Sequence, residues 1–297
     1  MTYQEFKNNI FHTISARLGS SYRVALQDII KNNDTHLDGL TILSENSNIS
    51  PTIYLNYYYE QYQNGKSLSC IYEDILLSYQ KNAFSKSIDI SFFTEFSKLK
   101  ERIIFKLINY ERNKELLSQV PHIRYLDLAI VFNCFIESPT GGYATILIYH
   151  HHLSYWNISC EDLYTLAKHN TPELLPFHLQ TMSDVLHELF DTNPIDRLYD
   201  DFSPIPMYVL TNACKLHGSG CILYEDLLAH ISFEINSDFY IIPSSIHEVL
   251  LIPTKNAASY DELSSMVCEI NSTQVSREEI LSDHVYFYSG HTGKITM

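Results

Sequence analysis

The chain of 297 residues is long enough for one large domain or two ordinary ones, and a chain of this length buries a substantial core. Its hydrophobic content of 45% and charged content of 19% exclude a disordered chain and a coiled coil, both of which are richer in charge. The 35 acidic residues against 20 basic ones give a net charge of -15, which repels a phosphate backbone and disfavours general nucleic-acid binding.

The start of the chain and its cysteines indicate a cytoplasmic protein with no membrane segment. Polar residues interrupt residues 1–14, where a signal peptide needs an unbroken apolar stretch, and no window approaches about 18 consecutive apolar residues. Six cysteines are scattered without close pairing, a distribution that favours reduced thiols over a disulfide framework. No motif in the sequence indicates a cofactor.

The N-terminal part of the chain predicts a helix followed by a hairpin. Phe6, Ile10 and Ile14 recur at helical spacing, which predicts an amphipathic first helix. Alternating apolar residues around an Asn-Asn-Asp turn at 32–34 predict a β-hairpin over residues 24–43.

A pair of helices completes this N-terminal α+β unit, to which we assign residues 1–98. Ser50 before Pro51 predicts an N-cap with proline in the first helical turn. An Asn-Gly pair at 64–65 ends that helix, and Ser67 opens the next one. The stretch that follows has no clear period and is the best candidate for a boundary.

Residues 99–297 predict a larger α+β unit, and the two units either fold separately or pack as one domain. An apolar run at 103–108 predicts a buried strand, and two long apolar runs within 126–149, joined by a Pro-Thr-Gly-Gly turn at 139–142, predict a second hairpin that leads into a helix. Short turns between these hairpins favour an α+β fold with mostly antiparallel sheets and helices packed on them. The remaining predicted elements are helices at 181–191, 221–233 and 261–270 and strands at 207–210, 239–242, 249–252, 285–288 and 294–296.

The string with the most reactive side chains lies at residues 244–248, between two apolar strands. Ser245, His247 and Glu248 are residue types that carry out proton transfer or nucleophilic attack. In an extended backbone Ser245 and His247 share one face, whereas Glu248 projects to the other. The same string also fits a polar turn that closes the ends of two strands.

A second acid and imidazole, Asp283 and His284, precede the terminal strands. They approach the string at 244–248 if the terminal strand pairs nearby. The string at 244–248 defines one alternative function, a hydrolase or transferase that uses His247 with Ser245 or Glu248.

Potential metal and anion ligands are poorly arranged in this sequence. The histidines at 150–152, expected at a strand end, point in alternating directions, whereas a metal needs ligands that converge. Cys214, His217 and Cys221 lack the spacing of a zinc knuckle. The Gly-Ser-Gly string at 218–220 either presents backbone amides to an anion or forms a flexible loop that lets a helix begin. We therefore predict no metal site.

Two surface patterns are candidates for binding. Tyr54, Tyr58 and Tyr62 share one helix face at fourfold spacing, so they either stack on a base or a partner protein or pack on the core with their hydroxyls at its rim. The acidic stretch at 184–201 provides a further alternative, an acidic mimic of nucleic acid, if its carboxylates line one exposed face.

Six strings, spread over nearly the whole chain, carry a family resemblance: LDGLTI at 37–42, NISPTIYLN at 48–56, FKLINYERNKELL at 105–117, DLAIVF at 127–132, PSSIHEV at 243–249 and LSDHVY at 281–286. They resemble a bacterial family of uncharacterised proteins, the domain of unknown function 5688, which is common in gut Gram-positive bacteria. The resemblance implies a soluble cytoplasmic protein, sometimes encoded among mobile-element genes, and transfers no catalytic residues.

The leading hypothesis from the sequence is a non-enzymatic protein that binds another macromolecule, such as an accessory factor of a mobile element. Its residues supply a core and a surface but no convincing reactive centre. The expected partner is a protein of unknown identity, while general nucleic-acid binding and membrane association are disfavoured by the charge and by the lack of an apolar span.

Overall fold

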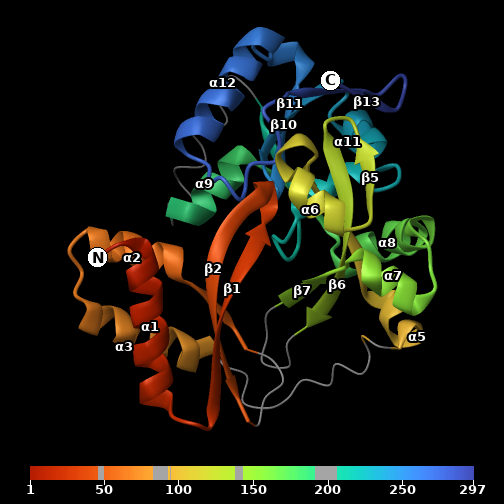
Figure 1. The fold of residues 1–297 in the computed structure, drawn as a ribbon. Helices are drawn as coiled ribbons and strands as arrows, with labels where there is room; N and C mark the ends of the chain where they lie inside the picture. Colours follow the sequence, from red (N-terminus) through yellow and green to blue (C-terminus); the bar gives the residue numbers. More distant parts are fainter. Residues whose placement is uncertain (46–49, 83–92, 94, 138–142, 191–205) are drawn as a thin grey trace. The chain divides into compact units, whose positions relative to one another are not determined.

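The computed structural model describes residues 1–45, 50–82, 93, 95–137, 143–190 and 206–297 (Figure 1). The chain divides into two compact units, the first made of residues 1–31 and 35–92 and the second of residues 32–34 and 93–297. The hairpin turn at 32–34 therefore belongs to the second unit although its two strands belong to the first. The predicted boundary at residue 98, with its two alternatives of separate folding or packing as one domain, stays a prediction.

In the described ranges of the first unit, three helices pack with a three-stranded antiparallel sheet of order β1-β2-β3. Phe6, Ile10 and Ile14 of the first helix are fully buried against Leu40 of the sheet and Ile71 of the third helix. The helical spacing predicted for this segment is therefore confirmed. The elements are α1 (Tyr3–Leu18), β1 (Tyr22–Lys31), β2 (Thr35–Ser44), β3 (Thr52–Tyr54), α2 (Leu55–Gln63) and α3 (Leu68–Asn82).

The predicted helix start at Ser50 and Pro51 is wrong. Residues 52–54 form β3 beside β2, and α2 begins only at Leu55. The hydroxyl of Ser50 accepts the backbone N–H of Ile42 at 2.9 Å, so it completes the edge of β2 instead of capping a helix.

Two antiparallel sheets organise the second unit. In the four-stranded sheet β6 pairs with β4, β5 and β7, and the six-stranded sheet has the order β13-β12-β10-β11-β9-β8, which makes β8 and β13 its border strands. The predicted α+β class with mostly antiparallel sheets is confirmed. The strands are β4 (Ile103–Asn109), β5 (His122–Tyr125), β6 (Leu128–Glu137), β7 (Tyr143–Leu147), β8 (Phe177–Thr181), β9 (Tyr208–Asn212), β10 (Phe239–Ser245), β11 (Glu248–Pro253), β12 (Tyr286–Ser289) and β13 (Lys294–Thr296).

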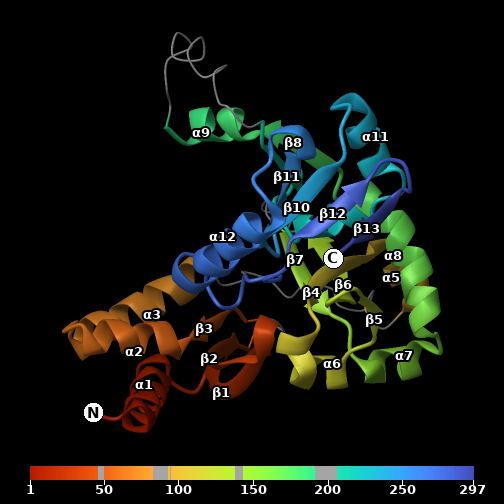
Figure 2. The ribbon, with the colours of Figure 1, turned by 90° about the horizontal axis from the view of Figure 1, so that it is seen from above.

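Helices cover these sheets. The helix α12 lies beside β10 and β11 (Figure 2). Its Leu263 and Val267 pack against Ile242 of β10 and Ile252 of β11. The helices are α5 (Phe96–Leu99), α6 (Lys114–Gln119), α7 (His150–Trp156), α8 (Cys160–Leu174), α9 (Met182–Phe190), α11 (Leu227–Glu234) and α12 (Tyr260–Thr273), with short 3-10 helices η1 (Asn32–Asp34), η2 (Lys100–Arg102), η3 (Glu111–Asn113), η4 (Gly218–Leu223) and η5 (Thr254–Asn256). None of the helices in the described ranges is long and apolar enough to span a bilayer.

Side chains of α8 close the outer edge of β4. Asn170 Nδ2 donates to the carbonyls of Lys100 at 2.7 Å and Ile103 at 3.0 Å, and Thr171 Oγ1 accepts the N–H of Phe105 at 3.1 Å. Backbone groups at a buried strand edge need such partners, because unpaired ones lose the hydrogen bonds they make to water.

The helix predicted over 221–233 is wrong in its first half. Residues 218–223 form η4, and α11 begins at Leu227. Asp226 between them has φ 58, in the left-handed region that interrupts a right-handed helix. The Pro-Thr-Gly-Gly turn predicted at 139–142 lies outside the described residues.

Candidate functional site

The turn at 246–247 joins β10 to β11, and Ser245 pairs with Glu248 across it. Ser245 Oγ accepts the N–H of His247 at 3.0 Å, and Ser244 Oγ donates to Glu248 Oε1 at 3.2 Å. Both hydroxyls therefore close the hairpin. The three predicted residues lie together, and the hydroxyl of Ser245 contacts the amide of His247 rather than its ring.

The ring of His247 stacks on a second imidazole, that of His217. The ring centroids lie 5.6 Å apart with 12° between their planes, and the backbone N–H of His217 donates to His247 Nδ1 at 3.2 Å. Because Nδ1 accepts this bond, the neutral ring of His247 carries its proton on Nε2. Burial lowers the pKa of His247, and the nearby Glu279 carboxylate opposes this shift only in part.

His217 itself is held in an unusual backbone conformation. Its φ of 55 and the φ of 50 at Lys215 both fall in the left-handed region, where side chains other than glycine are strained. Burial, with repulsion from Lys106 and His247, lowers the pKa of His217 well below its ordinary value. Its Nδ1 is buried and has no hydrogen-bond partner among the described residues. The pair is therefore uncharged near neutral pH.

Asn212 at the end of β9 fixes the loop that carries His217. Its Oδ1 accepts the N–H groups of Cys214 at 3.1 Å and Leu216 at 3.2 Å, and its Nδ2 donates to the carbonyl of Leu216 at 2.7 Å. A single amide side chain thus forms the hydrogen bonds to the backbone of this loop that a helix or strand would form with its own backbone groups.

The Gly-Ser-Gly string is a buried packing contact, so the predicted flexible loop is wrong. Ser219 Oγ donates to the carbonyl of Ile246 at 2.8 Å, and Thr211 Oγ1 donates to that of His247 at 2.8 Å. A Cβ built on Gly218 lies 2.4 Å from the carbonyl oxygen of His247 and 2.8 Å from Thr211 Cα. Glycine is required here because the two backbones approach so closely. This burial also removes the exposed amides that an anion needs.

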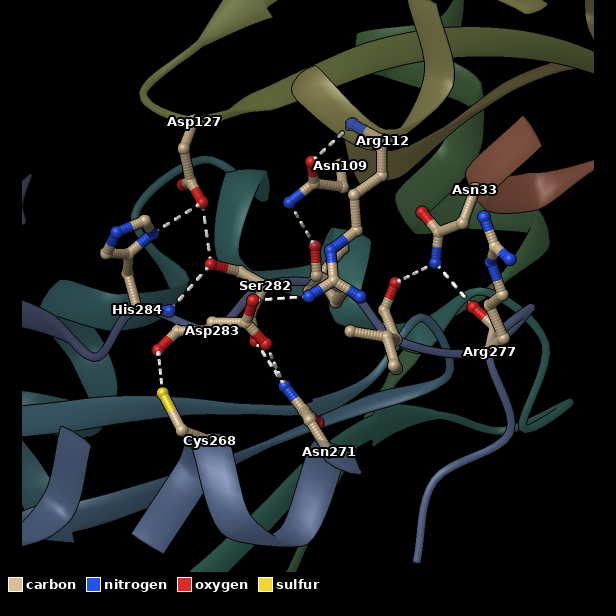
Figure 3. A network of polar contacts seen from close by, with 12 residues as sticks. Asn33, Asn109, Arg112, Asp127, Cys268, Asn271, Arg277, Ser282, Asp283 and His284 are labelled. Atoms are coloured by element: carbon tan, nitrogen blue, oxygen red, sulfur yellow. Dashed lines mark hydrogen bonds and ion pairs between the residues drawn. The ribbon is translucent and has the colours of Figure 1, made fainter. Parts of the chain in front are cut away.

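A second polar network surrounds Asp283 and His284 (Figure 3). His284 Nδ1 lies 3.1 Å from Asp127 Oδ2, Ser282 Oγ donates to the same oxygen at 2.6 Å, and the hydroxyl of Tyr286 donates to Oδ1 at 2.7 Å. Ser282 Oγ also accepts the N–H of His284 at 2.9 Å. The hydroxyl of Ser282 is thus held between a carboxylate and an amide, unlike a nucleophile, whose proton faces an imidazole.

Asp283 is engaged by two neighbours. Its carboxylate forms an ion pair with Arg112 and accepts a bond from Asn271 Nδ2 at 2.9 Å, and the same Nδ2 donates to the carbonyl of Ser282 at 2.9 Å. Among the described residues, no hydrogen bond or ion pair joins Asp283 to His247. The two groups of predicted site residues therefore form separate networks.

Asparagine side chains hold the segment at residues 277–284, which lies between α12 and β12 and has no regular structure (Figure 3). Asn33 Nδ2 donates to two of its carbonyls at 2.6 and 2.8 Å, and Asn109 Nδ2 donates to the carbonyl of Leu281 at 3.1 Å. Together with the side chain of Asn271, these amides form the hydrogen bonds to the segment's carbonyls that a neighbouring strand would form in a sheet. The network holds a backbone segment in place.

The tyrosines of α2 pack at the rim of the first unit's core. Tyr58 and Tyr62 are half-buried against that core, and the ring of Tyr62 lies 5.7 Å from that of Phe6. Tyr54 precedes α2, and its ring lies 4.7 Å from Lys31 Nζ. The arrangement is that of core packing with hydroxyls near the surface.

The three consecutive histidines form the first turn of α7, so their predicted place at a strand end is wrong. His152 Nδ1 accepts the N–H of Tyr149 at 3.0 Å, and burial lowers the pKa of His152 to about 4. In the described ranges, no group of three or more His, Cys, Asp or Glu side chains is placed to hold a metal ion.

Most of the acidic stretch at 184–201 lies outside the described residues. In its described part, Asp184 accepts a bond from Thr181 Oγ1 at 2.6 Å, and Glu188 accepts one from Gln180 Nε2 at 2.7 Å. Through these hydrogen bonds the two carboxylates connect α9 to β8. Mimicry of nucleic acid stays a prediction.

One surface feature that the sequence does not reveal is a groove of about 700 Å³, which we call the α8–α11 groove. Residues of α8, the start of β8 and the start of α11 line it, and Phe177, with 46% of its surface exposed, lies among them. Pro172, Pro176 and Leu227 add apolar surface to its lining. Its parts are distant in the sequence, so only the fold brings them together.

Comparison with known protein families finds one match: residues 3–290 match the family described as "Family of unknown function (DUF5688)". Neither the curated proteins nor the solved structures contain a match to the chain.

Proposed function

Because the chain belongs to the DUF5688 family, whose function is not known, we propose its role from its own geometry: a non-enzymatic protein that binds a partner protein in the cytoplasm. The cysteines support the reducing compartment. All six thiols are free, and Cys134 and Cys221 are buried in the core.

The observation that carries this proposal is that the reactive side chains are already hydrogen-bonded or ion-paired within the protein. Ser245 Oγ and His247 Nδ1 each accept a hydrogen bond from a backbone N–H. The carboxylate of Asp283 forms an ion pair with Arg112 and accepts a hydrogen bond from Asn271. An acid or base in catalysis must reach a substrate with a free proton or lone pair. Groups that hold turns and loops in this way favour a structural role.

The surface pockets support the same conclusion. Four of the pockets in the described part of the chain are lined by residues other than Ser245, His247, Asp283 and His284. A substrate site normally gathers its polar groups inside a concave pocket. The geometry therefore favours recognition by surface contacts.

A protein is the favoured partner class. The net charge of -15 repels nucleic acid and attracts basic protein surfaces. The α8–α11 groove, with its exposed Phe177, supplies the mixed apolar and charged surface that protein interfaces use.

The proposal is tested by capture and reconstitution. The full chain, tagged and expressed in its native cells, should retain a specific protein, and the two purified proteins should form a complex of defined stoichiometry. Ser245→Ala and His247→Gln variants that remain folded should form the same complex, because neither side chain acts on a substrate. Failure to reconstitute a complex with any captured protein, or loss of an enzymatic activity in these two variants, would contradict the proposal.

A further inference from the structure

The α8–α11 groove continues onto a border strand. β8 borders the six-stranded sheet, and Phe177, its first residue, also lines the groove. A border strand with unpaired backbone groups can accept another strand. Building on the proposed function, we propose that this groove and the free edge of β8 bind an extended, basic segment of the partner protein, which adds to the sheet as a further strand.

The register of β8 determines which of its backbone groups face outward. The N–H of Ala213 donates to the carbonyl of Pro176 and the N–H of Met182 to that of Met207, so the even-numbered positions of this edge face β9. Hydrogen-bonding direction alternates along an antiparallel strand. The N–H and C=O groups of the odd positions, including Phe177, therefore point away from the sheet.

These outward groups are available within the described part of the chain. No described residue forms a hydrogen bond with the outward backbone groups of Phe177 and Leu179. The two residues lie on one face of β8, because side chains alternate along a strand. An added strand would therefore pair with their backbone while its own side chains on that face lie beside Phe177 and enter the groove.

The lining of the groove fits one apolar side chain between basic ones. Phe177 and Leu227 supply apolar surface. The charged lining comprises three carboxylates, Glu173, Glu225 and Asp226, against one lysine, Lys168, whose Nζ lies 3.4 Å from Glu225. The excess of negative charge selects lysine or arginine side chains in the segment.

Other occupants fit this charge less well. A phosphopeptide or nucleic acid would bring negative charge to three carboxylates. A second copy of the chain, with a net charge of -15, would also be repelled. Basic protein segments are the class that both the groove and the strand edge accommodate.

The test uses random peptides displayed on phage, selected on the full immobilised chain. Enriched peptides should carry an apolar residue with a basic residue two positions before and two positions after it, because side chains two positions apart share one face of a strand. Synthetic versions should lose about tenfold or more in affinity for Phe177→Asp, because this change places a charge in the apolar lining. Phe233→Asp is the matched control, since Phe233 is an exposed phenylalanine of the same unit with 84% of its surface accessible, and it should bind as the unchanged chain does.

Two further experiments test separately the contribution of charge and the contribution of backbone hydrogen bonding to peptide binding. Glu173→Lys should weaken the selected peptides, whereas Glu269→Lys on α12 should not, since Glu269 is outside the groove. Methylating alternate amide nitrogens of a peptide should abolish binding in one register and spare it in the other, because only alternate amides of an added strand face β8.

The outcomes distinguish this inference from the proposed function. No enrichment, enriched peptides without basic residues, self-association through the groove, or equal binding by Phe177→Asp and Phe233→Asp would overturn the inference. A reconstituted partner complex that survives Phe177→Asp would overturn it as well and leave the proposed function standing. Absence of any partner complex would count against the proposed function itself.

Discussion

Gly218 illustrates how one residue determines the geometry around the histidine pair. The backbone of the turn at 246–247 lies so close to η4 that a methyl group at position 218 has no space. The contact also places His217 within reach of His247. At this scale the site residues act through packing and hydrogen bonds to the backbone.

Gly218→Ala should lower the free energy of unfolding by about 3 kcal/mol, because its Cβ meets backbone atoms that cannot rotate away. Gly220→Ala is the matched control. Its Cβ would meet only the ring of Phe105, at 3.1 Å, so a smaller loss is expected. Urea denaturation of both variants measures the difference, and equal stability of Gly218→Ala and the unchanged chain would contradict the packing described here.

Buried histidines should make stability depend on pH. The folded-state pKa values of His152, His217 and His247 are all lowered, that of His152 to about 4, whereas an unfolded histidine titrates near about 6.5. The unfolded state therefore takes up protons first as the pH falls. The free energy of unfolding should decrease from about pH 6.5 toward pH 5, because stability rises with pH wherever the unfolded state binds more protons.

Replacing one of these rings tests the cause. His217→Phe keeps an aromatic ring without a titrating nitrogen, so its unfolding free energy should vary less between pH 6.5 and pH 5 than that of the unchanged chain. His291→Phe, at an exposed position, should keep the original slope. If the unfolding free energy changed equally with pH in the unchanged chain, His217→Phe and His291→Phe, His217 would not exclude a proton in the folded state.

At the scale of elements, apolar runs predict the strands of the core well. β4, β6, β10 and β11 contain continuous buried residues, and their runs are visible in the sequence. β8 was not predicted because FHLQT is largely exposed and lacks such a run. β3 was not predicted because the serine before it accepts a hydrogen bond from the preceding strand β2, a contact that local capping signals do not show.

The candidate site was only partly predictable for the same reason. The string around His247 is visible because its residues are adjacent. Its stacking partner, His217, lies thirty positions away, and the asparagines that hold residues 277–284 come from three separate elements. Local patterns identify residue types, while the contacts that assign their roles depend on the fold.

Removing one asparagine should loosen residues 277–284. Asn33→Gly keeps a residue that tolerates the φ of 58 but removes the amide that donates to the carbonyls of Arg277 and Ile280. Backbone amides of 277–284 should then exchange with solvent faster, with a loss of about 2 kcal/mol in unfolding free energy. Asn32→Ala, which removes one such bond, to Glu278, should have a smaller effect. Unchanged exchange rates in Asn33→Gly would show that other contacts hold this segment.

For the whole molecule, the division into two units and the acidic charge set the kind of function that is feasible. The first unit uses its tyrosines to complete a core, and the second uses its polar residues to hold turns and a long irregular segment. In the described part of the second unit, the α8–α11 groove and the border strand β8 are available for recognition. The specificity of the proposed complex therefore depends on shape and charge.

Site-specific photo-crosslinking in the native cells is the most direct measurement of this account. A benzophenone amino acid at position 177, in the groove, should crosslink to one partner protein through a lysine- or arginine-rich segment, whereas the same group at position 233 should give none of that product. Identical products from both positions, or no protein product from position 177, would contradict the account.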